Sequence, residues 1–169
     1  MTAERVRVAI AEDEALAARH LERLVAGCPD LTLVGTATDG RQAVELLTST
    51  RPDALFLDVR LPILDGLQVL AALDFEPHVV FTTAYEAHAV TAFQLGAVDY
   101  LLKPFSDERF HDAVARVRRA LASPDVASGE RALPVTPLPE RAGGTLHAPG
   151  FITRLFVRER DAVRPVLVA

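Results

Sequence analysis

Residues 54–68 read ALFLDVRLPILDGLQ, a complete transition from a strand to a helix. The first four residues are apolar, as in a parallel strand that is covered on both faces. Asp58 ends this run, and Pro62 marks the turn that follows. Asp65 with Gln68 three positions later is the pattern of a helix start. The stretch therefore predicts one β-strand, a loop that begins at a carboxylate, and one α-helix.

The same alternation of apolar runs and helical periodicity extends over residues 6–121. Strands are expected at residues 6–11, 31–36, 54–57, 79–82 and 100–102. Four of these runs are almost continuously apolar, whereas residues 31–33 alternate like an edge strand. Helices are expected between the strands, with further starts at Asp39 and Ser106. Five successive βα units predict a doubly wound α/β fold with a five-stranded parallel sheet.

The composition of the chain argues against several classes of function. The 169 residues, half of them apolar, suit one compact domain with an additional segment. With 18 Lys and Arg against 23 Asp and Glu, the net charge is −5, which argues against direct DNA binding by most of the chain. The single cysteine, Cys28, excludes a disulfide framework and a structural zinc site, so we expect a cytoplasmic protein. The apolar run 6–11 is too short for a signal peptide or a membrane span, so no membrane association is expected.

Three segments are predicted along the chain. Residues 1–122 contain the βα units and form the expected compact domain. Residues 123–150 are rich in proline and glycine and show no helical or strand period, which is typical of a flexible linker. Residues 151–169 return to β-like sequence, and the runs 152–158 and 163–168 predict a short β-hairpin.

Polar side chains that can bind ions or phosphate follow four of the predicted strands. Because the carboxyl ends of parallel strands meet at one edge of a sheet, these side chains are expected to lie together. Two carboxylates about 4 Å apart repel by roughly 4 kcal/mol at an effective dielectric constant near 20, so such a cluster needs either a cation or a raised carboxyl pKa. All the candidate ligands are oxygens, which favours magnesium over a softer metal ion. The residues concerned are Glu12 and Asp13 after the first strand, Asp58 after the third, Thr82 and Thr83 at the fourth, and Lys103 after the fifth.

Four short motifs give the chain a resemblance to a known family. They are EDE at 12–14, DVRLPILDG at 58–66, TTA at 82–84 and YLLKPF at 100–105. In this order and on these predicted elements, they resemble the receiver domain of bacterial two-component response regulators. The resemblance covers residues 5–121 and implies the flavodoxin-like receiver fold, whose strand order is 2-1-3-4-5. It also implies a cis peptide bond between Lys103 and Pro104.

The resemblance implies a role for each motif residue. Asp58 would be the phosphoacceptor, and Thr83 and Lys103 would bind phosphoryl oxygens. A phosphoryl group on Asp58 would draw the Thr83 hydroxyl inward and leave space for Tyr100, so Thr83 and Tyr100 would form the switch. The implied ligands of Mg²⁺ are Glu12, which would act through a water molecule, Asp13, Asp58 and the backbone carbonyl of Arg60.

The resemblance also implies partners. A sensor histidine kinase would supply the phosphoryl group, and the face of the fourth helix, fifth strand and fifth helix, roughly residues 85–121, would form a homodimer. Residues 81–85 and 93–104 resemble receivers that precede a LytTR-type DNA-binding domain, and residues 151–169 resemble the opening strands of such a domain. The implied function is a response regulator that controls transcription. DNA would be bound only through a complete LytTR-type output domain, which is missing or incomplete in this chain.

Three alternatives are open at the level of sequence. A stand-alone receiver would act through protein–protein contacts alone. An aspartyl-phosphate phosphohydrolase would have a second acid two positions after the nucleophile, where this chain has Arg60. A flavodoxin-like binder of small ligands would carry a glycine loop after the first strand, where this chain has Glu12 and Asp13. We expect no enzymatic activity beyond self-phosphorylation from a phosphodonor and autodephosphorylation.

Overall fold

The computed structural model describes residues 5–84, 96–123, 154–159 and 162–167. The chain divides into two compact units, Met1–Ser128 and Gly129–Ala169. In the second unit, β6 (Arg154–Glu159) and β7 (Ala162–Leu167) form an antiparallel pair. Residues 124–150 of the expected linker lie outside the described residues.

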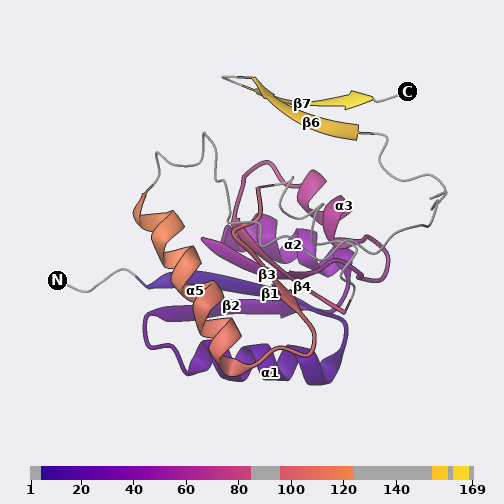
Figure 1. Cartoon of the computed structure of the whole chain (residues 1–169). Helices are drawn as coiled ribbons and strands as arrows, with labels where there is room; N and C mark the ends of the chain where they lie inside the picture. Colours follow the sequence, from indigo (N-terminus) through magenta and orange to yellow (C-terminus); the bar gives the residue numbers. More distant parts are fainter. Residues whose placement is uncertain (1–4, 85–95, 124–153, 160–161, 168–169) are drawn as a thin grey trace, which may run out of the picture. The chain divides into compact units, whose positions relative to one another are not determined.

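Five parallel strands of the first unit form one sheet. Their bounds are β1 Val6–Ala11, β2 Leu31–Ala37, β3 Ala54–Asp58, β4 His78–Thr83 and β5 Asp99–Leu102. Within the described residues the order is β2-β1-β3-β4-β5, so β2 and β5 are the edge strands (Figure 1). The predicted α/β class and strand order are confirmed, and each predicted end of these five strands lies within one residue of the observed one.

Helices connect the strands, and side-chain caps define several of their starts. Their bounds are α1 Ala15–Ala26, α2 Gly40–Thr50, α3 Gly66–Ala71 and α5 Asp107–Ala122. Asp39 caps α2 and Asp65 caps α3, each through a 2.8 Å hydrogen bond from the backbone N–H three residues on. The Ser106 hydroxyl caps α5 in the same way at 3.2 Å. No helix in the described residues has both the length and the apolar character of a membrane span. The residues expected to begin the fourth helix, 85–95, lie outside the described part of the chain.

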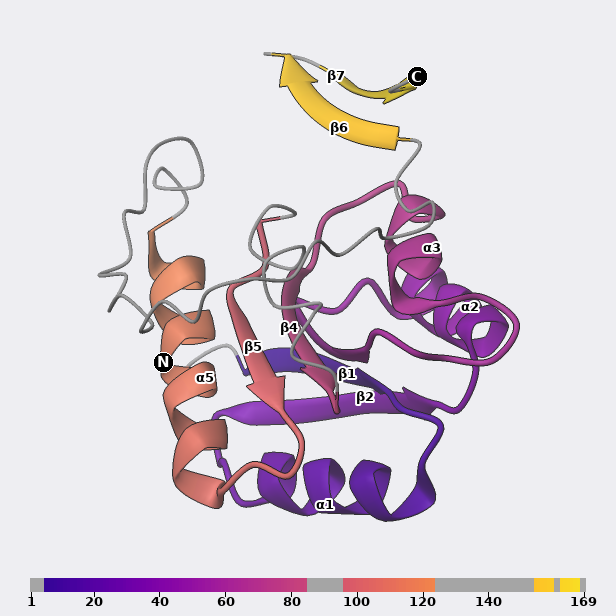
Figure 2. The ribbon, with the colours of Figure 1, turned by 45° about the vertical axis from the view of Figure 1, so that its right-hand side comes forward.

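The helices cover the sheet in two layers. Figure 1 and Figure 2 show α1 and α5 on one face, and α2 and α3 on the other. Along β1, β3, β4 and β5, successive side chains alternate between these two faces, whereas the pairing of β2 with β1 contains a register shift. The strands contribute Val8, Ile10, Phe56, Val80 and Leu101 to the α1/α5 face, and Ala9, Ala11, Leu55, Leu57, Val79 and Phe81 to the α2/α3 face. Because the alternation continues to the strand ends, it determines the face on which each polar side chain at the carboxyl edge lies.

Candidate functional site

Three carboxylates lie together at the carboxyl edge of the sheet. Glu12 and Asp13 follow β1, and Asp58 ends the neighbouring strand β3. One oxygen of each carboxylate lies within 4.8 Å of the others. Glu12 is fully buried and Asp58 nearly so, whereas Asp13 is exposed. Burial raises the pKa of Glu12, because the ionised carboxylate loses its water, and the nearby Lys103 ammonium opposes this shift.

Lys103 supplies a positive charge to this cluster. Its Nζ lies 2.9 Å from Oδ2 of Asp58 and 2.5 Å from Oε2 of Glu12, so one ammonium bridges both buried carboxylates. Burial by itself would lower the pKa of Lys103, but the hydrogen bonds to Glu12 and Asp58 outweigh it and leave the pKa raised. Lys103 is therefore positively charged at neutral pH. The peptide bond from Lys103 to Pro104 is cis, as the resemblance implies.

The loop after Asp58 is held by backbone contacts. The N–H of Arg60 donates to Oδ1 of Asp58 at 2.9 Å. The N–H of Gly66 donates to the Val59 carbonyl at 2.8 Å. A Cβ atom on Gly66 would lie 2.5 Å from the Asp58 carbonyl oxygen, so only glycine fits this close approach. The two side-chain oxygens of Asp58 are thus oriented separately, Oδ1 by the loop and Oδ2 by Lys103.

The donor atoms of this cluster fit magnesium. All of them are hard oxygens, and opposite ligands of an octahedral Mg²⁺ lie about 4.2 Å apart, twice the Mg–O distance. The three carboxylate oxygens all lie within 4.8 Å of one another, which is close enough for one divalent ion to be shared among them, directly or through a water molecule. The structure brings Glu12, Asp13 and Asp58 together. Arg60, whose carbonyl is the fourth predicted ligand, lies in the loop that binds Asp58, and the role of that carbonyl stays a prediction.

The two threonines at the end of β4 are both buried, and they face opposite sides of the sheet. Thr82 follows Val80 by two positions, which places its side chain on the α1/α5 face. Thr83 follows Phe81 by two positions and lies on the α2/α3 face, against which Tyr100 also packs. The two predicted switch residues, Thr83 and Tyr100, therefore share one face of the sheet, and their roles stay predictions.

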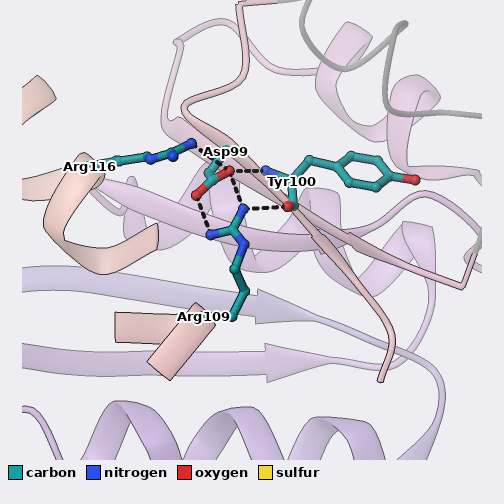
Figure 3. Close-up of polar contacts among 4 residues, drawn as sticks. All are labelled: Asp99, Tyr100, Arg109 and Arg116. Atoms are coloured by element: carbon teal, nitrogen blue, oxygen red, sulfur yellow. Dashed lines mark hydrogen bonds and ion pairs between the residues drawn. The ribbon is translucent and has the colours of Figure 1, made fainter. Parts of the chain in front are cut away.

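A buried ion-pair group lies at the start of β5, beside Tyr100 (Figure 3). The Asp99 carboxylate, 1% exposed, accepts hydrogen bonds from Arg109 at 2.6 and 2.8 Å and from Arg116 at 3.1 Å. Oδ1 of Asp99 also accepts from the N–H of Tyr100 at 2.7 Å, and Nη2 of Arg109 donates to the Tyr100 carbonyl at 2.9 Å. Both backbone groups of Tyr100 are therefore bonded to this group, while its ring points away from the carboxylate (Figure 3). We name Asp99, Arg109 and Arg116 the Asp99 clamp.

The Asp99 clamp is not among the features predicted from the sequence. The available signal was an aspartate at the start of an apolar strand, followed by an arginine in the first turns of the next helix. A carboxylate on a strand that helices cover needs a partner, and this reasoning would have led to Arg109 as a candidate.

A protein-family model described as the response regulator receiver domain matches residues 8–115. The chain belongs to this family. The receiver is 37% identical to the transcriptional regulatory protein BtsR of Salmonella typhi, over 72% of this chain and 52% of that protein. It is 39% identical to the sensory transduction protein LytT of Oceanobacillus iheyensis, over the same two shares. The chain thus spans about half the length of these curated relatives.

Solved receiver structures share the fold of this chain. The response regulatory domain of mrkE from Klebsiella pneumoniae is 35% identical with a TM-score of 0.64, over 69% of this chain and 98% of that one. The receiver domain of AraT from Geobacillus stearothermophilus is 33% identical with a TM-score of 0.61, over 70% of this chain and 97% of that one. These similarities confirm the predicted family and the predicted receiver fold.

Proposed function

We propose that this receiver accepts a phosphoryl group on Asp58 from a sensor histidine kinase, with magnesium bound beside it. The position of Asp58 gives the strongest support. Asp58 ends β3 at the carboxyl edge of the sheet, with Lys103 on one oxygen and the other carboxylates beside it. A nucleophile, a group of oxygens that suits a divalent ion and an ammonium therefore surround one point where a phosphorus atom can sit.

In the proposed reaction, an oxygen of Asp58 attacks the phosphorus of a phosphohistidine. A P–O bond forms while the P–N bond breaks, and the imidazole leaves. A carboxylate is ionised at neutral pH, so the attack needs no general base. The transition state spreads negative charge over three phosphoryl oxygens, so the rate depends on positioning and on charge neutralisation.

Residues of this chain would share that neutralisation. The Lys103 ammonium would turn toward one phosphoryl oxygen, and the Thr83 hydroxyl would donate to a second. We propose no enzymatic activity beyond this transfer and the hydrolysis of the acyl phosphate, because Arg60 stands where a phosphohydrolase would need an acid. Magnesium would be held by the carboxylates of Glu12, Asp13 and Asp58 and by the carbonyl of Arg60. Its positive charge would neutralise further negative charge on the phosphoryl group.

Phosphorylation would reach the rest of the molecule through Thr83 and Tyr100. Both side chains lie on the α2/α3 face, so a Thr83 hydroxyl that turns toward the phosphoryl group would leave space for the Tyr100 ring. The Asp99 clamp holds the backbone of Tyr100, so the ring would move while the strand stays in place. We propose a homodimer through the fourth helix, β5 and α5, roughly residues 85–121, of which residues 85–95 lie outside the described part.

For the complete protein, we propose control of transcription through a LytTR-type DNA-binding domain. BtsR, and YpdB of Escherichia coli O6:H1, which is 37% identical over 78% of this chain, are both named transcriptional regulatory proteins. LytT is named a sensory transduction protein. Because the chain spans about half the length of these relatives, the DNA-binding role is assigned to a complete output domain. A kinase partner and a DNA target both favour a cytoplasmic location.

Substitution of Asp58 tests the proposal. After incubation with acetyl phosphate and Mg²⁺, the wild-type chain should gain one phosphoryl group by intact-protein mass measurement, and EDTA should prevent the gain. Asp58→Asn should gain none, because the amide keeps the shape but lacks the nucleophilic charge. Asp74→Asn, which alters an exposed ion pair with Arg51, is the matched control and should behave like the wild type. A hydroxylamine-sensitive phosphoryl group on Asp58→Asn would place the acceptor elsewhere.

A further inference from the structure

Thr82 carries a fully buried hydroxyl beside the proposed phosphoacceptor. Thr82 is 0% exposed, and within the described part of the chain its Oγ1 atom has no hydrogen-bond partner. Burying a hydroxyl without a partner costs free energy, so such groups are rare in native proteins and need a physical reason. Valine has nearly the same shape and would fill this position without that cost.

Thr82 stands in a row with Asp58 and Leu101. These two residues, on β3 and β5, are its register partners on the neighbouring strands. Leu101 and Val80 both pack into the core of the α1/α5 face, and Phe56, two residues before Asp58, does the same. Because side chains alternate along a strand with a period of two, Thr82 and Asp58 face this same side of the sheet.

The Lys103 side chain runs past Thr82. Lys103 follows β5, yet its Nζ lies 2.9 Å from Oδ2 of Asp58 on β3. β4 lies between these two strands in the sheet, so the Lys103 side chain crosses the end of β4. Lys103 comes two residues after Leu101 and therefore faces the α1/α5 side, as Thr82 does. Thr83 faces the opposite side, so Thr82 is the threonine of β4 that lies on the path of Lys103.

We propose that Thr82 is a positioning residue for Lys103 in the phosphorylated protein, an inference that rests on the proposed function of Asp58. An ammonium has three N–H donors, and here Glu12 and Asp58 are its two carboxylate partners. When Asp58 carries a phosphoryl group, the ammonium donates to a phosphoryl oxygen instead. The Thr82 hydroxyl, which has two lone pairs, then accepts another N–H of the ammonium and holds it over β4.

Two substitutions test the role of the Thr82 hydroxyl separately from the role of the side-chain shape. Thr82→Val keeps the shape and removes the hydroxyl, and Thr82→Ser keeps the hydroxyl. We expect Thr82→Val to unfold at a higher urea concentration than the wild type, yet to take up phosphoryl groups from acetyl phosphate about tenfold more slowly at saturating Mg²⁺. The maximal rate should fall rather than the affinity for acetyl phosphate, because Lys103 acts mainly on the developing charge. Thr82→Ser should restore the rate.

A second pair of substitutions tests the same hydroxyl in case valine disturbs the packing at position 82. Thr82→Ala and Thr82→Ser both lack the methyl group and differ only in the hydroxyl. Equal uptake rates in this pair would overturn the proposal, as would a Thr82→Val chain that is more stable than the wild type and equally fast. A wild-type chain that takes up no phosphoryl group would instead overturn the proposed function of Asp58, which Asp58→Asn tests separately.

Discussion

Ile63, in the loop after Asp58, has a backbone conformation that its side chain disfavours. Its φ is 73°, in the left-handed region, and its side chain is 71% exposed. A β-branched residue loses about 1–2 kcal/mol in this region, whereas asparagine tolerates it. We therefore expect Ile63→Asn to raise the free energy of unfolding by about 1 kcal/mol in urea denaturation.

Leu16 offers a control for this substitution. It is also an exposed apolar residue, 74% exposed, but it lies in the first turn of α1. Leu16→Asn should lower stability by about 0.5 kcal/mol, because asparagine is a weaker helix former than leucine. If both substitutions change stability in the same direction, backbone strain at Ile63 is not the cause.

Glu12 makes the stability of the fold depend on pH. Burial raises its pKa in the folded protein above the ordinary value of 4.5. The folded state then binds more protons at Glu12 than the unfolded state, so the contribution of Glu12 to stability is greatest below pH 4.5 and is lost as the pH rises through the folded pKa. In Glu12→Gln, the side chain at position 12 has no ionisable group, so this pH-dependent contribution is absent. The stability of Glu12→Gln relative to the wild type should therefore increase from about pH 4 to about pH 7 in urea denaturation.

The opposite pH trend in the relative stability of Glu12→Gln would contradict a raised pKa of Glu12. A relative stability that falls over this pH range would show that the Lys103 ammonium lowers the pKa of Glu12 by more than burial raises it. Lys103 itself does not titrate in this range, because its pKa is raised from 10.5.

At the scale of elements, the Asp99 clamp fastens the edge strand β5 to α5. Asp99→Asn would remove the buried negative charge and leave Arg109 and Arg116 without their anion. We expect the free energy of unfolding to fall by about 2–3 kcal/mol. The amide hydrogen of Tyr100, which donates to Asp99, should also exchange faster with solvent. Urea denaturation and hydrogen exchange measure these two effects.

The pair of Asp30 and Arg118 is the matched control for the clamp. Its hydrogen bonds of 2.6 and 2.7 Å are as short as those of Asp99, but both side chains are 43% exposed. Water screens this pair, so Asp30→Asn should cost less than about 1 kcal/mol. Equal losses for Asp30→Asn and Asp99→Asn would show that burial does not explain the effect of the clamp.

The elements of this fold could be predicted because their signals are local. The caps Asp39, Asp65 and Ser106 each bind a backbone group three residues away, so the sequence shows both partners. The clamp joins Asp99 to residues 10 and 17 positions away, across a strand, a loop and a helix, and no spacing in the sequence reveals such a contact. In the sequence, Arg116 is one of several cations on the last helix, and only the structure shows that it binds Asp99.

At the scale of the whole molecule, the parallel sheet made the carboxyl-edge cluster predictable. The strand ends must meet, so Glu12, Asp58 and Lys103 come together whatever the details of packing. The sequence does not show which hydrogen bonds form there. Thr82 and Thr83 are adjacent and chemically identical, and only the structure shows that Thr82 is buried without a hydrogen-bond partner among the described residues.

The chain of 169 residues should not bind DNA with sequence selectivity. Its 18 Lys and Arg against 23 Asp and Glu leave a net charge of −5, whereas DNA affinity depends on clustered cations that contact phosphates. Fluorescence anisotropy with a pool of promoter fragments, at about 150 mM salt, should show no selective sub-micromolar binding with or without acetyl phosphate. Selective sub-micromolar binding by this chain would contradict the prediction.

Lys103 acts as a built-in counter-ion. The two buried carboxylates that it bridges would otherwise repel each other in the folded protein. The stabilisation that a dissolved cation gives to a protein depends on its free concentration, whereas an ammonium that belongs to the chain is always present. The folded domain therefore carries its own counter-ion for these two carboxylates, whatever the metal content of the solution. Under the proposed function, magnesium would then be required for phosphoryl transfer, while Lys103 supplies the counter-ion of the fold.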